Sequence, residues 1–322
     1  MQFTPLKFQV PLAMGGVALM AFNYLQFAIP HGEGLITMSD VASAGLTTNQ
    51  LWLYLPLIVI MLAFSVLNLG FILVYLKQIM QWLANKPKYQ EFMTGPPTLN
   101  VGIFVPIASL SMTACVLLAP IAFFIPQLSS NGQAMMLLGL IFFGTLWLIL
   151  FRLEFKVLKI WLSHPLDATK LNFVWLLDVF AFGLVSLTGT GIAAMSQNVT
   201  IASIAAVASL FTLIFGLFLL VAKLSYLFYL QMKAESLPGK HVLPAYFILI
   251  PISCLFGFSF YRVMIYLQSY YLFDMKVLLF FSITFPYIIT IGWGLFCVYL
   301  LSDYLRKDFL KSEFAPTQWG MV

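Results

Sequence analysis

The sequence predicts an all-α polytopic membrane protein, and three observations lead to this fold class. Hydrophobic residues make up 62% of the 322 residues and charged residues only 8%, whereas soluble domains carry about a quarter charged residues. Eight apolar runs each reach the roughly 20 residues that a helix needs to cross a bilayer. The polar connections between these runs alternate in basic charge, which is typical of a chain that crosses a membrane repeatedly.

The eight predicted spans form a single transmembrane domain over residues 1–322. Consecutive spans pair into parallel helical hairpins, each of which starts and finishes on the same side of the membrane. The hairpins cover about 5–90, 96–160, 165–235 and 238–310. The predicted limits of the spans are 9–30, 51–77, 100–126, 134–158, 172–196, 199–230, 242–268 and 277–305.

The distribution of basic residues predicts the orientation of the chain. If the N-terminal side is called inside, all 16 basic residues except Arg262 and Lys276 fall in inside segments. Basic residues in short connections are retained on the cytoplasmic side of the membrane. We therefore expect a multi-pass protein of the cell membrane, in bacteria the inner membrane, with a cytoplasmic N-terminus.

Prolines mark a repeat along the chain. The odd-numbered spans each begin at a proline turn on the inner side, and spans 1, 3 and 7 carry a further proline at Pro11, Pro106 and Pro251. A proline inside a helix frees a carbonyl group and bends the helix. A repeated hairpin predicts a pseudo-symmetric ring or bundle. Residues 314–322 resemble the start of the other hairpins, so we interpret them as the start of a truncated fifth hairpin.

The two members of each hairpin differ in composition. The odd spans are rich in glycine, serine and threonine, as in the segment DVFAFGLVSLTGTGIAAMSQ at 178–197, whereas the even spans are almost purely apolar. Small and hydroxylic residues suit helices that are buried among other helices. We therefore expect the odd helices to lie inside, around a pore, and the even helices to face lipid.

Four short segments resemble the family of voltage-dependent anion channels and C4-dicarboxylate transporters, which includes the bacterial tellurite-resistance protein TehA and the plant slow anion channels. They are FQVPLAMGGVAL in span 1, VPIASLSMTAC in span 3, LIPISCLFGFSFY in span 7 and PTQWG near the C-terminus. The resemblance implies ten helices in five hairpins, a central pore inside the odd helices and a homotrimer. It also implies transport of small anions. The family's pore-blocking phenylalanine lies on the ninth helix, beyond Val322, and has no counterpart among these residues.

One face of each odd span is a candidate pore lining. Hydroxyl groups, freed carbonyls and aromatic rings along such a face can pass an anion without binding it tightly. The alternative is that these small residues only pack the inner helices together. The candidates are Gly15, Phe22, Pro106, Ser109, Thr113, Phe182, Ser186, Gly189, Thr190, Ser253, Gly257 and Phe260.

Asp178 is the one acidic residue that the sequence places well inside a predicted span. An intramembrane carboxylate is costly, so it is a candidate for proton coupling or for a filter at the pore mouth. The alternative is a structural carboxylate near the interface, held by Lys170 or by a neighbouring helix.

The remaining charged residues near the span ends have two interpretations. Arg262 and Lys276 would attract anions to the outer mouth of a pore, or they would reach the headgroups and pair locally, for example with Asp274. We expect Arg152, Glu154 and Lys156 at the end of span 4 to be solvated at the headgroups, and Lys223 in span 6 likewise.

Three functions fit this sequence. The first is a passive or weakly coupled path for small inorganic or organic anions. The second is a proton-coupled carrier or exporter of a C4-dicarboxylate, sulfite or a tellurite-like oxyanion. The third is a non-transporting scaffold or receptor subunit in the lipid bilayer. We expect no enzyme activity, catalytic residue, cofactor, metal site or nucleic-acid partner, because no motif for any of them occurs and Cys115, Cys254 and Cys297 lack metal-site spacing.

Overall fold

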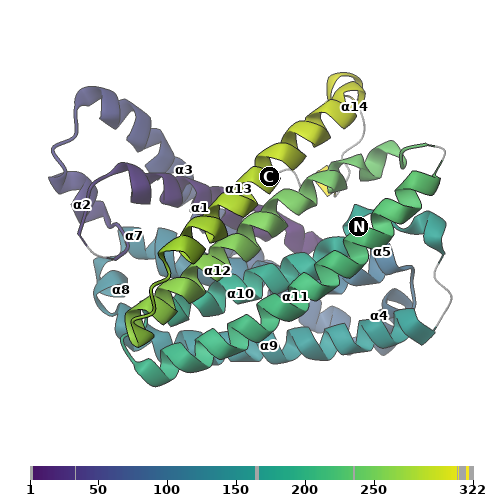
Figure 1. Cartoon of the computed structure of the whole chain (residues 1–322), viewed down its shortest axis with the longest axis horizontal. Helices are drawn as coiled ribbons and strands as arrows, with labels where there is room; N and C mark the ends of the chain where they lie inside the picture. The colour runs from purple at the N-terminus through teal and green to yellow at the C-terminus, as the bar shows by residue number, and fades with distance from the viewer. Residues whose placement is uncertain are drawn as a thin grey trace.

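The chain is an all-helical polytopic membrane protein (Figure 1). The computed structural model describes residues 3–32, 34–163, 167–234, 236–309, 311 and 317–318, without the side chain of Thr169. The described part contains no strand and includes eight helices long and apolar enough to cross a membrane, as predicted. The predicted fifth hairpin start at 314–322 lies outside the described residues except for Thr317 and Gln318.

Each span contains one main α-helix, which has between 12 and 37 residues. The main helices of the eight spans, in chain order, are α1 (Gln9–Ala28), α3 (Thr48–Ala84), α6 (Val105–Val116), α9 (Gly132–Ser163), α10 (Leu177–Met195), α11 (Val199–Lys233), α12 (Leu249–Tyr271) and α13 (Lys276–Leu300). Short helices lie in the connections and at both ends of span 3: α2 (Met38–Ser43), α4 (Lys86–Met93), α5 (Pro97–Asn100), α7 (Ala122–Phe124), α8 (Pro126–Ser130) and α14 (Ser302–Lys307).

The odd spans share a structural feature that the even spans lack. A 3₁₀ segment leads directly into the α-helix of each odd span: η1 (Pro5–Phe8), η2 (Val101–Phe104), η5 (Phe173–Leu176) and η6 (Lys240–Ile248). The prolines Pro11, Pro106 and Pro251 stand in the first turn of the α-helix after this segment. They therefore lie inside the continuous helices Pro5–Ala28, Pro97–Phe124 and Lys240–Tyr271, as predicted, and the bend at each proline stays a prediction.

Odd and even spans differ in burial. In the most apolar window of each span, the buried share is 44, 78, 89 and 61% for spans 1, 3, 5 and 7, but 28, 28, 39 and 0% for spans 2, 4, 6 and 8. The odd helices therefore form the inner layer and the even helices the outer one. The closed ring and the pore stay predictions.

Helix α10 is the centre of the inner layer. It packs against α6 and α12 within this layer, and against α9 and α11 of the outer layer. Figure 1 shows α10 among α9, α11 and α12, with α13 alongside α12. Its glycines and hydroxyl residues allow this close approach of neighbouring backbones. Helix α10 is thus in direct contact with four other helices of the spans.

Candidate functional site

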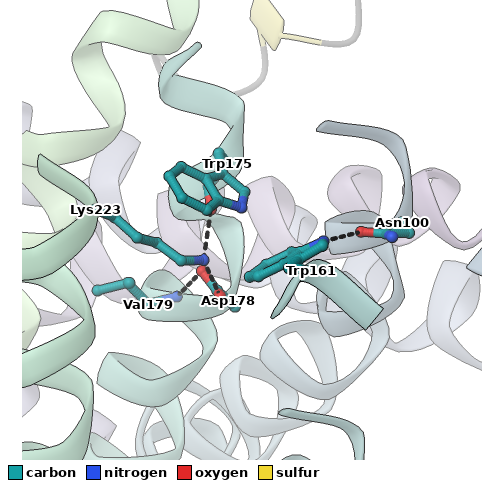
Figure 2. A network of polar contacts seen from close by, with 6 residues as sticks. All are labelled: Asn100, Trp161, Trp175, Asp178, Val179 and Lys223. Atoms are coloured by element: carbon teal, nitrogen blue, oxygen red, sulfur yellow. Dashed lines mark hydrogen bonds and ion pairs between the residues drawn. The ribbon is translucent and has the colours of Figure 1, made fainter. Parts of the chain in front are cut away.

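A buried ion pair joins α10 to α11. The ammonium group of Lys223 contacts the Oδ2 atom of Asp178 (Figure 2). The two side chains are 4% and 0% exposed. Lys223 also donates a hydrogen bond to the backbone carbonyl of Trp175, at 3.1 Å. The headgroup-facing position predicted for Lys223 is therefore wrong. Lys170, the partner considered for Asp178, pairs instead with Asp167 at the surface.

The position of Asp178 follows from the local structure of span 5. It is the second residue of α10, directly after the 3₁₀ segment, where Pro106 stands in span 3. Its Oδ1 atom accepts a hydrogen bond of 2.7 Å from the backbone N–H of Val179. The N-terminus of a helix carries partial positive charge. Both the helix and Lys223 therefore stabilise an ionised Asp178.

Two tryptophans enclose the ammonium group. The Nζ atom of Lys223 lies 4.3 Å from the ring centroid of Trp161 and 4.7 Å from that of Trp175. The indole N–H of Trp161 donates to Oδ1 of Asn100 at 3.2 Å, and the amide group of Asn100 donates to the carbonyl of Met93. Cation–π contacts of a desolvated ammonium are worth about 2 kcal/mol. The rings thus replace part of the hydration that Lys223 loses.

A second carboxyl group faces the same pair. Glu154 of α9 is 0% exposed and lies within electrostatic range of both Asp178 and Lys223. Within the described part of the chain, neither of its carboxyl oxygens has a hydrogen-bond partner. The solvated position predicted for Glu154 is wrong, whereas Arg152 and Lys156 on the same helix are exposed as expected.

Glu154, Asp178 and Lys223 together form what we call the charge cluster. Its members come from three consecutive spans, α9, α10 and α11, and lie toward the side predicted to be cytoplasmic. One ammonium balances one carboxylate, so the second carboxylate is uncompensated whenever it is ionised. An uncompensated charge in a buried site costs several kcal/mol. The arrangement can therefore bind and release one proton.

The glycines predicted to line a pore pack against neighbouring helices. A Cβ atom at Gly15 would lie 2.5 Å from Met112, and one at Gly189 would lie 2.5 Å from Phe143 and 2.1 Å from Ser209. One at Gly257 would lie 2.0 Å from Pro286. Gly189 and Gly257 thus face outer-layer helices. Each glycine permits a close contact of the kind that the packing interpretation describes.

The other pore candidates lie in similarly closed surroundings. The ring of Phe182 lies 5.2 Å from that of Phe151 and 5.6 Å from that of Phe215. Phe22 is buried beside the outer ends of α1 and α3, and Phe260 is half-buried. Pro106, Ser109 and Ser186 are buried, while Thr113, Thr190 and Ser253 donate to carbonyls of their own helices.

Arg262 and Lys276 have different surroundings. Nη1 of Arg262 donates to the carbonyl of Leu187 on α10 at 3.2 Å, and the guanidinium stacks over the ring of Phe258 at 4.4 Å. Lys276 is exposed at the start of α13. Asp274 accepts a hydrogen bond from the backbone N–H of Lys276, not from its ammonium group.

One sequence signal for Lys223 was overlooked. Lys223 stands in the apolar segment LFLLVAKLSYLF, ten residues before Lys233 at the end of α11. That separation is about 15 Å of helix, which is too far for an ammonium group to reach the headgroups easily.

Comparison of the chain with known protein families, with characterised proteins and with solved structures finds no match.

Proposed function

We propose that this polytopic membrane protein is a proton-coupled transporter of small anions. The observation that carries the proposal is the fully buried carboxyl group of Glu154, which has no hydrogen-bond partner among the described residues, beside the Asp178–Lys223 ion pair. Ionisable residues inside a membrane protein are costly, and many of those known serve as proton relays of pumps and carriers.

The charge cluster has two states of different charge. With a proton on Glu154, Asp178 and Lys223 balance each other and the cluster is neutral. After the proton leaves, two carboxylates face one ammonium group, and the excess charge favours a conformation in which the cluster is better solvated. Because its members belong to three helices, this change alters how α10 packs against α9 and α11.

An anion as the transported substrate is supported by the resemblance of the four segments to anion channels and dicarboxylate transporters. A carrier is favoured over an open channel because Gly15, Gly189 and Gly257 make close helix contacts instead of facing a water-filled path. In this mechanism Asp178 keeps Lys223 in place, Glu154 carries the proton, and movement of α10 transmits the change to the anion path.

The test uses the purified chain in proteoliposomes with an imposed pH gradient and nitrate, chloride or succinate as the transported anion. The wild type should move at least one of these anions at a rate that depends on the gradient. Glu154→Gln should abolish the dependence on the gradient. The matched control is Glu91→Gln, at an exposed acidic residue of α4, which should behave as the wild type.

Two outcomes would contradict the proposal. If Glu154→Gln keeps the full dependence on the pH gradient, the charge cluster is not the coupling site. If the folded wild type moves none of these anions, the protein is not an anion transporter, and the scaffold hypothesis takes precedence.

A further inference from the structure

Arg262 lies deep within the membrane-spanning part of the chain. It stands nine residues before the end of α12 at Tyr271, which corresponds to about 13 Å of helix. Its guanidinium donates to the carbonyl of Leu187, near the middle of α10. A snorkelling arginine would point to the headgroups, whereas this one points toward the middle of the inner layer.

Among the described residues, the positive charge of Arg262 has no carboxylate partner. The ion pairs in the described part of the chain are Lys170–Asp167, Lys223–Asp178, Lys240–Asp308 and Lys307–Asp303. A guanidinium has five N–H donors, and the described residues supply one hydrogen-bond acceptor, the Leu187 carbonyl. An unpaired arginine within a membrane is costly and is by default a functional group.

The residues around Arg262 make space for its guanidinium group and place polar groups near it. A Cβ atom at Gly191 would lie 3.0 Å from Nη1, so the glycine makes space for the charged group. The ring of Phe258 covers one face of the guanidinium. The thiol of Cys115 on α6 lies 3.8 Å from the hydroxyl of Thr188 on α10 and within electrostatic range of Arg262. Three inner-layer helices therefore converge at this point.

We infer that Arg262 is the anion-binding residue of this protein, and that its preferred ligand is a planar oxyanion such as nitrate or a carboxylate. The planar fork of a guanidinium matches two coplanar oxygen atoms better than it matches a spherical ion. The inference rests on the proposed function and names its substrate class. Helix α10 links the two sites, because it carries both Asp178 and, about 13 Å along the helix, Leu187.

The test measures binding of sodium nitrate to the full chain in detergent by calorimetry, with sodium chloride as the comparison at equal ionic strength. The wild type should bind nitrate more tightly than chloride. Arg262→Gln should weaken nitrate binding roughly tenfold or more, because it removes charge-assisted hydrogen bonds. Lys276→Gln, at an exposed cation of the same predicted outer side, is the matched control and should bind as the wild type does.

Two further variants keep the charge and decide the matter if Arg262→Gln does not fold. Arg262→Lys should reduce the preference for nitrate over chloride, because an ammonium group acts as a point charge. Gly191→Ala should weaken nitrate binding several-fold by crowding Nη1. Unchanged nitrate affinity in every folded variant would overturn the inference.

Failure of this inference is distinguishable from failure of the proposed function. Glu154→Gln should bind nitrate normally while losing its response to a pH gradient. Nitrate binding at Arg262 without gradient-driven flux would leave the site standing and refute proton coupling. If Arg262→Gln shows gradient-driven nitrate flux with an unchanged KM, the anion site at Arg262 is refuted while proton coupling stands.

Discussion

At the scale of single residues, the two buried carboxyl groups differ in what surrounds them. Asp178 has an ammonium group, a backbone N–H and a helix N-terminus to stabilise its charge. Glu154 has none of these contacts within the described part of the chain. In the proposed mechanism, this difference makes the carboxyl group of Asp178 the partner that holds Lys223 and that of Glu154 the proton carrier.

Removing Lys223 should destabilise the protein strongly. Lys223→Met leaves Asp178 buried without its counter-charge, and breaking a buried pair in this way costs about 3–5 kcal/mol. Thermal unfolding in detergent should therefore show a marked loss of stability, and Asp178→Asn added to Lys223→Met should restore part of it. Lys233→Met, at an exposed lysine of the same helix, is the control. A single Lys223 variant as stable as the Lys233 variant would contradict a buried pair.

The sequence predicted one member of the charge cluster but not its partners. Asp178 is identifiable because it follows the start of a span that is otherwise free of charge. Its partners lie 24 and 45 positions away, at Glu154 and Lys223. Whether those side chains face inward depends on how α9 and α11 are rotated about their axes, and nearly uniform apolar helices carry no periodic pattern that fixes this rotation.

At the scale of the helix, close packing of α10 depends on the absence of side chains. Gly189→Ala should destabilise the contact of α10 with α9 and α11, because the added Cβ atom meets Phe143 and Ser209. Overpacking of this kind costs about 1–3 kcal/mol. The control is Gly144→Ala on α9, where nothing lies within 4 Å; it should be neutral or stabilising. The measurement is again thermal unfolding, and equal stabilities of the two variants would contradict the tight contact.

The short helix α2 should fray in acid. The hydroxyl and the backbone N–H of Thr37 donate to Oδ2 of Asp40 at 2.6 and 2.7 Å, and these hydrogen bonds lower the pKa of Asp40 from its usual 3.8. A lowered folded-state pKa contributes stability above the unfolded-state value, and this stability is lost as the pH falls through the folded-state pKa.

Hydrogen exchange of the Val41 amide, corrected for intrinsic rates, measures this effect. Protection should decrease from about pH 6 to about pH 3 in the wild type. Asp40→Asn should remove the pH dependence. Equal protection of the wild type at both pH values would show that the Thr37–Asp40 contact does not hold the start of α2.

The sequence predicted the helices better than their starts. The existence and order of the eight spans follow from apolar length alone, and the structure confirms them. The 3₁₀ segments that open the odd spans were not predicted, since a proline near a span start fits either a kinked helix or a first-turn position. The hydrogen-bond pattern of the preceding residues decides between the two, and it is not visible in composition.

At the scale of the whole molecule, the inner layer of odd helices was predictable because burial among helices favours small residues. The buried shares of the spans agree with this sorting. The prediction of a pore went one step further, because helix faces made of small residues suit both close helix contacts and water-filled paths. The contacts at Gly189 and Gly257 lie against outer-layer helices, which composition does not distinguish from a pore face.

The orientation in the membrane is testable by cysteine labelling. With Cys115, Cys254 and Cys297 replaced by serine, Ser39→Cys and Lys88→Cys each place a thiol at an exposed position. The positive-inside distribution predicts that a membrane-impermeant maleimide labels position 39 in intact cells and position 88 only after the cells are opened. The reverse pattern would place the N-terminus outside.

The most direct test of the account is infrared spectroscopy of the carboxyl groups in the purified protein. The absorption band of a protonated carboxylic acid is separate from that of a carboxylate, so it reports the proton on Glu154 itself. The wild type at neutral pH should show a protonated, buried carboxyl band that is absent from Glu154→Gln and present in Glu91→Gln. Absence of this band from the wild type, or its persistence in Glu154→Gln, would contradict a proton held at the charge cluster.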